Sequence, residues 1–69
     1  MEIQFAVHLK SLREEAGLTQ AQLAEKLGTT QRKISYWESG KIEPDLATLW
    51  SIADFFELSI DELLGRTHL

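Results

Sequence analysis

Apolar residues recur at helical spacing in five consecutive stretches of the chain. In the first stretch, Phe5, Leu9, Leu12 and Ala16 are four, three and four positions apart, so they share one side of a helix. The later stretches predict helices at about 20–27, 31–39, 46–56 and 60–64. Their predicted inward residues are Leu23, Ala24, Leu27, Ile34, Trp37, Leu46, Leu49, Ile52, Ala53, Phe56, Ile60, Leu63 and Leu64. No stretch alternates with the period of a strand, so we expect an all-α fold of five short helices around one core.

Residues that cap and end helices stand at the boundaries of these stretches. Thr19 with Gln22, and Ser59 with Glu62, have the spacing of capping boxes, while Thr30 and Asp45 are expected as N-caps. Four glycines mark the expected helix ends: Gly17, Gly28, Gly40 and Gly65. Residues 66–69 follow the last of these and are expected to fray.

The size and composition of the chain narrow the possibilities. Its 69 residues leave room for a single domain over 1–69, and 43% hydrophobic with 26% charged residues is typical of a folded one. Because cysteine is absent, neither disulfides nor thiolate chemistry is available. We see no membrane span and no basic leader, so we expect a cytoplasmic protein.

Charge is distributed unevenly along the chain, although the total is −4. Residues 1–41 sum to +1, and residues 42–69 sum to −5 because Arg66 stands alone there among six acids. An anionic partner would therefore be attracted to the first part and repelled by the second.

The predicted third helix has an outward side without acidic residues. At 100° per residue, Ile34 and Trp37 point to the core, whereas the opposite side carries Gln31, Arg32, Lys33, Ser35 and Tyr36. Such a helix fits the major groove of DNA, where Arg bonds guanine O6 and N7 and Gln bonds adenine N6 and N7. A merely solvated helix is the alternative interpretation of these side chains.

The spacing before this helix favours DNA contact over the solvated alternative. Ala24, Gly28 and Ile34 follow Gln20 by four, eight and fourteen positions. A small residue lets two helices cross closely, a glycine permits a left-handed turn, and an isoleucine fills the gap beneath. Residues 20–39 are therefore predicted to form a helix-turn-helix.

From about residue 5 to 65 the sequence resembles the helix-turn-helix domains of the phage repressor and Cro type, also called the XRE family. The matching segments are Leu9-Lys10, Leu12-Arg13, Gly17-Leu18-Thr19-Gln20, Leu23-Ala24, Leu27-Gly28, Ile34, Trp37-Glu38-Ser39-Gly40-Lys41, Pro44, Leu49, Ile52-Ala53 and Ser59-Ile60-Asp61-Glu62-Leu63-Leu64. The resemblance implies a lambda-repressor-like domain that binds operator DNA as a two-fold dimer with its third helix in the major groove.

The resemblance also implies roles for particular residues. Gln31, Arg32 and Tyr36 occupy base-reading positions, and Arg13 with Glu38 matches an ion pair between the first and third helices. Gln20 and Lys41 match phosphate contacts, and the positive end of a helix dipole at Gln20 and the charge of Lys41 fit that role. Flanking contacts are expected from Thr30, Lys33 and Ser35.

Two aromatic residues of the fourth helix exceed what a small core can hide. Trp50 and Phe55 flank its inward stripe, and we expect either the rim of the core or a dimer surface there. Dimerisation at this end would set two recognition helices about 34 Å apart, one turn of DNA. Glu57 stands where many members of the family have Asn or Gly at the end of this helix.

The remaining polar residues do not predict a catalytic or metal site. His8 and His68 lack ligand spacing and are expected to be solvated, and the adjacent acids of Glu14-Glu15 and Asp61-Glu62 splay apart. We therefore expect no enzyme, cofactor, metal or small-molecule substrate.

The preferred hypothesis is a sequence-specific regulator of transcription that binds double-stranded DNA as a homodimer and acts as a repressor. The alternative is a protein-interaction module, antitoxin-like or an adaptor, that works through its aromatic C-terminal half.

Overall fold

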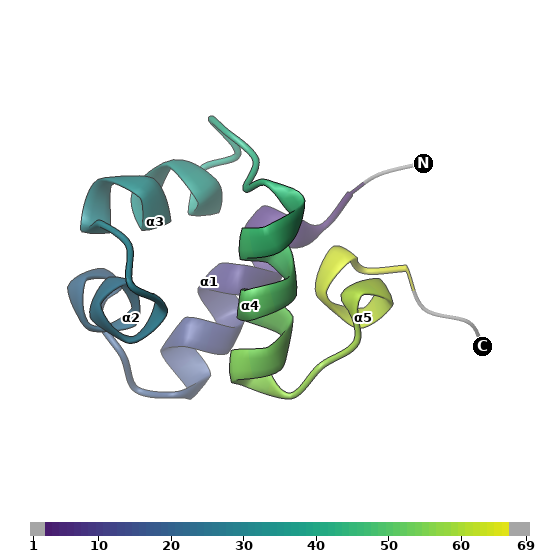
Figure 1. Cartoon of the computed structure of the whole chain (residues 1–69), viewed down its shortest axis with the longest axis horizontal. Coiled ribbons are helices and arrows are strands. Elements are labelled where there is room, and N and C mark those ends of the chain that lie inside the picture. The colour runs from purple at the N-terminus through teal and green to yellow at the C-terminus, as the bar shows by residue number, and fades with distance from the viewer. Residues whose placement is uncertain (1–2, 67–69) are drawn as a thin grey trace.

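The computed structural model describes residues 3–66, and all regular structure in that range is helical. The five helices are α1 (Phe5–Glu15), α2 (Gln20–Leu27), α3 (Gln31–Glu38), α4 (Leu46–Phe56) and α5 (Ile60–Leu64). Helix α1 packs against α3 and α5, while α4 lies against α2 and α5 (Figure 1). This arrangement confirms the predicted all-α fold. None of the five helices is long and apolar enough to cross a membrane.

The helices begin where their capping residues predict. Thr19 and Ser59 each accept a hydrogen bond from the backbone three positions later and complete capping boxes, and Thr30 and Asp45 cap α3 and α4. Helix α3 ends at Glu38, one residue before the predicted end, and Ser39 is its C-cap. These boundaries follow from local hydrogen-bond chemistry, which explains why the sequence predicts them well.

Every helix contributes one completely buried aliphatic side chain to a shared core. These five residues, one from each helix in chain order, are Leu9, Leu23, Ile34, Ile52 and Leu63. Phe5, Ala24, Trp37 and Ala53 complete the buried cluster. Because the same core holds all helices, α3 is fixed relative to the rest of the chain through Ile34 and Trp37.

Three residues lie elsewhere than the pattern predicts. Leu46 is 84% exposed because, in the first turn of α4, it borders an open hollow instead of packing into the core, and Ala16 is exposed because it follows the last turn of α1. Helical spacing gives the side of a helix on which a residue lies, but not how far along the axis its neighbours extend. His8, expected to be solvated, is half-buried with Nδ1 3.2 Å from the carbonyl oxygen of Glu62. His68 lies outside the described residues.

Gly65 permits the end of α5 to lie against the start of α1. The backbone N–H of Gln4 donates to the carbonyl of Leu64 at 2.9 Å, and a Cβ placed on Gly65 would be 2.6 Å from the Cβ of Gln4. Gly65 also has a φ of +81°. The sequence marks it only as a helix end, because the close approach depends on how α1 and α5 pack.

Candidate nucleic-acid interface

Helices α2 and α3 are joined by a short turn that sets the angle between them. Gly28 adopts a left-handed φ of +70°, and the N–H of Thr29 donates to the carbonyl of Ala24 at 2.9 Å. A Cβ on Gly28 would meet no heavy atom within 4 Å, so the turn requires glycine for its backbone conformation and not for space. Ala24 and Ile34 are buried where the two helices meet.

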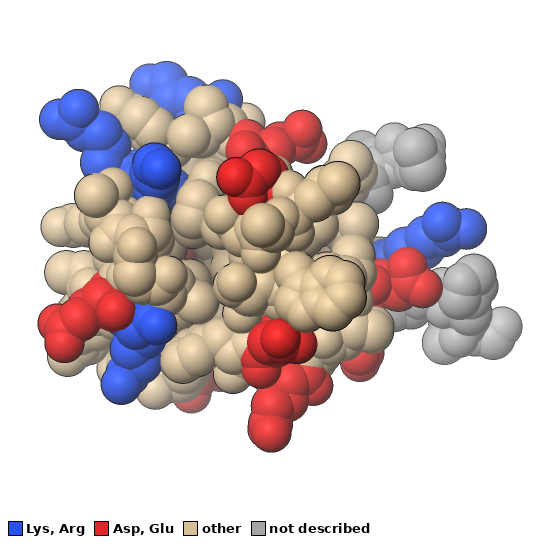
Figure 2. Space-filling view, in the orientation of Figure 1, with Lys and Arg blue, Asp and Glu red and all other residues tan. Residues whose placement is uncertain are grey.

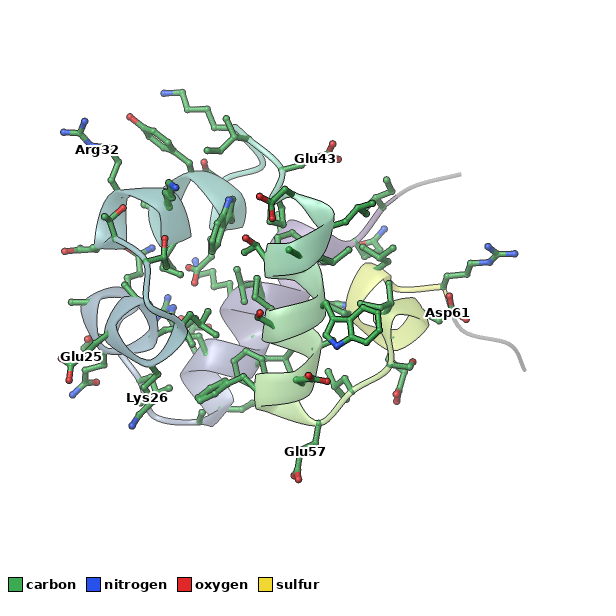
Figure 3. The ribbon with its side chains drawn as sticks, in the orientation of Figure 1. Glu25, Lys26, Arg32, Glu43, Glu57 and Asp61 are labelled. Carbon is green, nitrogen blue, oxygen red and sulfur yellow. The ribbon has the colours of Figure 1, made fainter. Side chains whose placement is uncertain are left out.

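The outward side of α3, which we call the recognition face, comprises Gln31, Arg32, Lys33, Ser35 and Tyr36. The first three are exposed, and Ser35 and Tyr36 are half-buried. Arg32 extends away from the body of the molecule (Figure 3). No acid belongs to this face, because Glu38, the single acid of α3, turns inward with its side chain only 4% exposed. The face therefore offers donors, acceptors and positive charge to a ligand.

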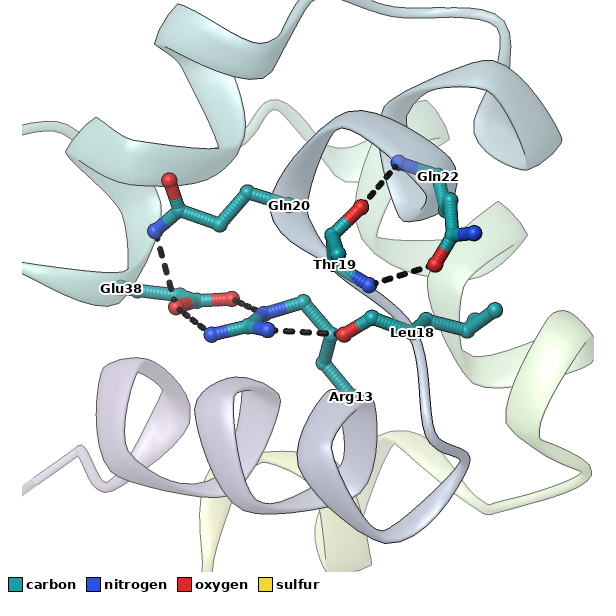
Figure 4. Close-up of polar contacts among 6 residues, drawn as sticks. All are labelled: Arg13, Leu18, Thr19, Gln20, Gln22 and Glu38. Carbon is teal, nitrogen blue, oxygen red and sulfur yellow. Dashed lines mark hydrogen bonds and ion pairs between the residues drawn. The ribbon is translucent and has the colours of Figure 1, made fainter.

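Glu38 connects α3 to α1 and α2 through a network of polar contacts (Figure 4). Nε of Arg13 donates to Oε2 of Glu38 at 2.6 Å and Nη2 donates to Oε1 at 3.0 Å. Nη1 of Arg13 donates to the carbonyl of Leu18 at 2.8 Å, and Nε2 of Gln20 donates to Oε1 of Glu38 at 3.2 Å. The hydrogen bond with Glu38 is the main cause that raises the pKa of Arg13. This network holds α3 at a fixed position over α1 and the start of α2.

The bond between Gln20 and Glu38 is not apparent from the sequence. Gln20 is expected as a phosphate contact, yet here its amide nitrogen binds a carboxylate on another helix. The two residues are 18 positions apart, so no local spacing could indicate the bond. Gln20 opens α2 at the positive end of the helix dipole, where the N–H of Gln22 already donates to the side chain of Thr19.

Lys41 lies over the ring of Tyr36, a contact that the sequence also did not indicate. Its Nζ is 5.3 Å from the ring centroid, within the range of a cation–π interaction. The backbone N–H of Lys41 donates to the carbonyl of Tyr36 at 2.9 Å, so the chain folds back over the end of α3. A residue expected to contact phosphate thus also touches a residue expected to contact bases.

The charge difference between the two parts of the chain is also a difference in space. In Figure 2, Lys and Arg side chains gather over α3, both signs of charge lie over α2, and Asp and Glu dominate around α4 and α5. Asp45 lies at the border between them. Hydrogen bonds from the side chain and backbone of Thr48 lower the pKa of Asp45, and Lys33 lowers it further.

Trp50 and Phe55 are both exposed, but on opposite flanks of α4. Trp50 is 68% and Phe55 39% exposed. Five residues correspond to about 140° around a helix, so the two rings cannot form one continuous surface. Phe55 packs edge-on against Phe56, with 4.9 Å between ring centroids.

Comparison with known proteins decides the family. A helix-turn-helix family model matches residues 9–63, most of the chain. The chain belongs to the helix-turn-helix family. Among curated relatives, it is 45% identical over 97% of its length to the HTH-type transcriptional activator BcrR of Enterococcus faecalis. It is 41% identical over 84% of its length to the cryptic phage CTXphi transcriptional repressor RstR of Vibrio cholerae. The chain covers 33% of the first relative and 52% of the second.

Solved structures of the family share the same fold. A transcriptional regulator from Listeria innocua matches the entire chain with a TM-score of 0.90 and 40% identity, and the chain covers 64% of it. The P22 c2 repressor, solved with a synthetic operator, matches 91% of the chain with a TM-score of 0.84 and 25% identity, and the chain covers 96% of it. These matches confirm the predicted resemblance to phage repressors. The fold also occurs within hydroxypropylphosphonic acid epoxidase from S. wedmorenis, of which the chain covers 34%.

Proposed function

We propose that this helix-turn-helix chain binds specific double-stranded DNA sequences with α3 in the major groove and represses transcription as a homodimer. The observation that carries the proposal is the recognition face: five outward residues without an acid, in a chain that has eleven acids. A helix free of acids on its outward side can approach stacked base pairs and phosphates without repulsion.

Each residue of the recognition face has a role that its chemistry suits. We assign base contacts to Gln31, Arg32 and Tyr36, with Arg32 bonding guanine and Gln31 bonding adenine. Flanking contacts are assigned to Thr30, Lys33 and Ser35. The backbone at Gln20 and the ammonium of Lys41 are assigned to phosphates, which position the helix and make affinity depend on salt.

The relatives support DNA binding and regulation of transcription. The P22 c2 repressor was solved with operator DNA, and the phage CTXphi relative is named as a repressor. BcrR is named as an activator, so the family contains activators as well as repressors. We favour repression because the phage CTXphi relative and the P22 c2 neighbour are both named as repressors, and a protein that occupies DNA can block another with its DNA contacts alone.

Two copies are proposed because a single eight-residue helix contacts few base pairs. Dimers of this kind bind half-sites whose centres are about 34 Å apart, one helical turn. Trp50 and Phe55 lie on different flanks of α4, so they cannot both belong to one small contact. Of the two, Phe55 is the candidate for contact between copies, because Trp50 borders a hollow lined by Asp54 and two copies meeting there would bring like charges together.

The test is selection of bound duplexes from a random DNA library at low salt. We expect one enriched sequence with two inverted half-sites, and loss of its enrichment in Arg32→Ala and Tyr36→Ala. Lys26→Ala is the matched control, since it removes one positive charge from α2 on a side remote from Arg32 (Figure 3). We expect this control to select the same sequence as the unmodified chain.

Different failures of this experiment reject different parts of the proposal. If the unmodified chain enriches no sequence, specific DNA binding is rejected. If Arg32→Ala and Tyr36→Ala enrich the original sequence unchanged, the assignment of the base contacts is rejected. A single half-site without inverted symmetry rejects the homodimer.

A further inference from the structure

Helix α4 exposes an apolar surface that no helix of the described chain covers. Leu46 is 84% and Trp50 68% exposed, and they stand four residues apart, so their side chains lie on the same side of the helix. We call this pair the α4 apolar face. An exposed leucine and tryptophan on successive turns of a helix are costly to leave in water and are typical of interaction surfaces.

A hollow lies at each end of this face. Leu46 borders a depression that reaches Ile3, itself 57% exposed, and Glu43. Trp50 borders a second depression that reaches Asp54 and the start of α5 at Ile60. The face therefore borders two separate shallow hollows, which side chains of a partner could enter.

The charges around the two hollows are of one sign. Glu43 lines the first and Asp54 lines the second, and neither is lined by Lys or Arg from within residues 3–66. Acidic side chains also dominate the surrounding surface in Figure 2. If two copies met symmetrically across this face, each would bring its acids toward those of the other, and such like-charge contacts are unfavourable.

We propose that the α4 apolar face binds a positively charged amphipathic segment of a different protein. Apolar side chains of the segment would enter the two hollows and cover Trp50, and its Lys or Arg residues would face Glu43 and Asp54. An amphipathic helix laid into an apolar groove is an established way to recognise such a surface. The pairing of an apolar anchor with basic flanks follows from the charges lining these hollows.

The proposal does not depend on DNA binding. Helices α3 and α5 lie on opposite sides of α4 in Figure 1, and the hollow beside Trp50 is formed by α4 and the start of α5. A partner anchored at this hollow would lie across α4 from α3 and its recognition face. The surface would thus allow the chain to hold a protein and DNA at the same time.

The experiment selects binders from a displayed library of random peptides of ~14 residues, about four helical turns. We expect enriched peptides to carry net positive charge and apolar residues three or four positions apart. Synthetic copies of these peptides should bind Trp50→Ala with at least about tenfold lower affinity than the unmodified chain, as expected for a tryptophan anchor. Their affinity for Asp54→Lys should fall by a similar factor. Glu25→Lys makes the same charge change on α2, far from the face, and should change affinity less than about twofold.

Three results would each overturn the proposal. The first is that no enriched peptide loses affinity in Trp50→Ala, while circular dichroism shows that the variant is folded. The second is that the enriched peptides are neutral or acidic. The third is sedimentation showing that the free chain forms dimers that Trp50→Ala dissociates, because the face would then bind a second copy. DNA selection relies on α3, so a failure of DNA binding would be seen separately.

Discussion

Arg13 and Glu38 form a two-point ion pair between α1 and α3, and both side chains are largely withdrawn from solvent. Their contacts measure 2.6 and 3.0 Å, and the side chains are 12% and 4% exposed. The guanidinium of Arg13 also donates to the carbonyl of Leu18, and the carboxylate of Glu38 also accepts from Gln20. Removing one member of this partly buried pair leaves the other charge with one neutral hydrogen-bond partner and no opposite charge.

Removing one member of this pair should destabilise the fold strongly. We expect Arg13→Met or Glu38→Leu to lower the free energy of unfolding by about 2 kcal/mol each, because each removes two charge-assisted hydrogen bonds and leaves a partly buried charge without its opposite charge. The double substitution should cost less than the sum, with a coupling of about 2 kcal/mol. Urea denaturation of the four proteins measures these values, and Glu25→Gln, an exposed acid on α2, is the control. Strict additivity of the two substitutions would contradict the coupling.

The sequence predicts the helices accurately because their ends depend on nearby residues. Thr19 bonds Gln22 and Ser59 bonds Glu62 whatever the rest of the chain does, and Gly28 adopts its turn locally. The sides of the helices follow from spacing, which is why Ile34 and Arg32 lie on opposite sides of α3 as predicted.

What the sequence does not predict depends on how helices meet in space. The bond of Gln20 to Glu38 and the stacking of Lys41 on Tyr36 require the tertiary arrangement. The exposure of Leu46 depends on the open hollow that it borders in the folded chain. The recognition face and an exposed position of Trp50 could be outlined in advance, whereas the contacts within the recognition face and the exposure of Leu46 beside Trp50 could not.

Glu57 ends α4 in a conformation that suits other residues better. It is the non-glycine residue with a positive φ, +57°, within residues 3–66. We expect Glu57→Gly to raise the free energy of unfolding by about 1 kcal/mol, because the left-handed conformation is costly for a residue with a Cβ. In a domain of this size that gain corresponds to about 4–8 °C in Tm, measurable by calorimetry.

A second substitution separates backbone strain from charge at this position. The carboxylate of Glu57 also lies at the negative end of the α4 dipole. Glu57→Ala removes the charge but keeps the Cβ, so it should stabilise less than Glu57→Gly. Equal gains in Tm for the two variants would mean that the charge, and not the backbone conformation, is responsible.

Two capping carboxylates make stability depend on pH. Hydrogen bonds from the side chain and backbone of Thr48 lower the pKa of Asp45, and hydrogen bonds from the backbone and side chain of Ser59 lower that of Glu62. A carboxyl whose pKa is lower in the folded state stabilises the fold above its unfolded pKa, about 4. This stabilisation is lost as pH falls through the lowered folded value.

Replacing these carboxylates by amides keeps the caps but removes the titrating groups. The free energy of unfolding should then fall less steeply as the pH is lowered. Asp45→Asn retains an N-cap and Glu62→Gln retains a capping box. Compared with the unmodified chain, the double variant should lose less stability between roughly pH 5 and pH 2, as followed by urea midpoints. Glu25→Gln, outside any cap, should leave the curve unchanged. A double variant with the original acid slope would show that these caps do not cause it.

Lys41 is expected to act on DNA in two ways, because its ammonium lies 5.3 Å from the ring centroid of Tyr36. As a phosphate contact, its loss in Lys41→Ala should weaken binding to all sequences and reduce the salt dependence by about one charge. As the group that orients Tyr36, its loss should also relax preference at the base pair that Tyr36→Ala affects. Lys41→Arg keeps a cation over the ring and should retain the preference.

The two roles of Lys41 can be distinguished by comparing base preference with overall affinity. Binding of the selected site and its single-base variants is measured for Lys41→Ala, Lys41→Arg and the control Lys26→Ala at several salt concentrations. If Lys41→Ala lowers affinity equally for every variant, the lysine contacts phosphate but does not orient Tyr36. Lys41 follows the end of α3 and so lies outside the helix that we assign to base contacts. If Lys41→Ala changes preference at the same base pair as Tyr36→Ala, the contact between the two side chains transmits the effect.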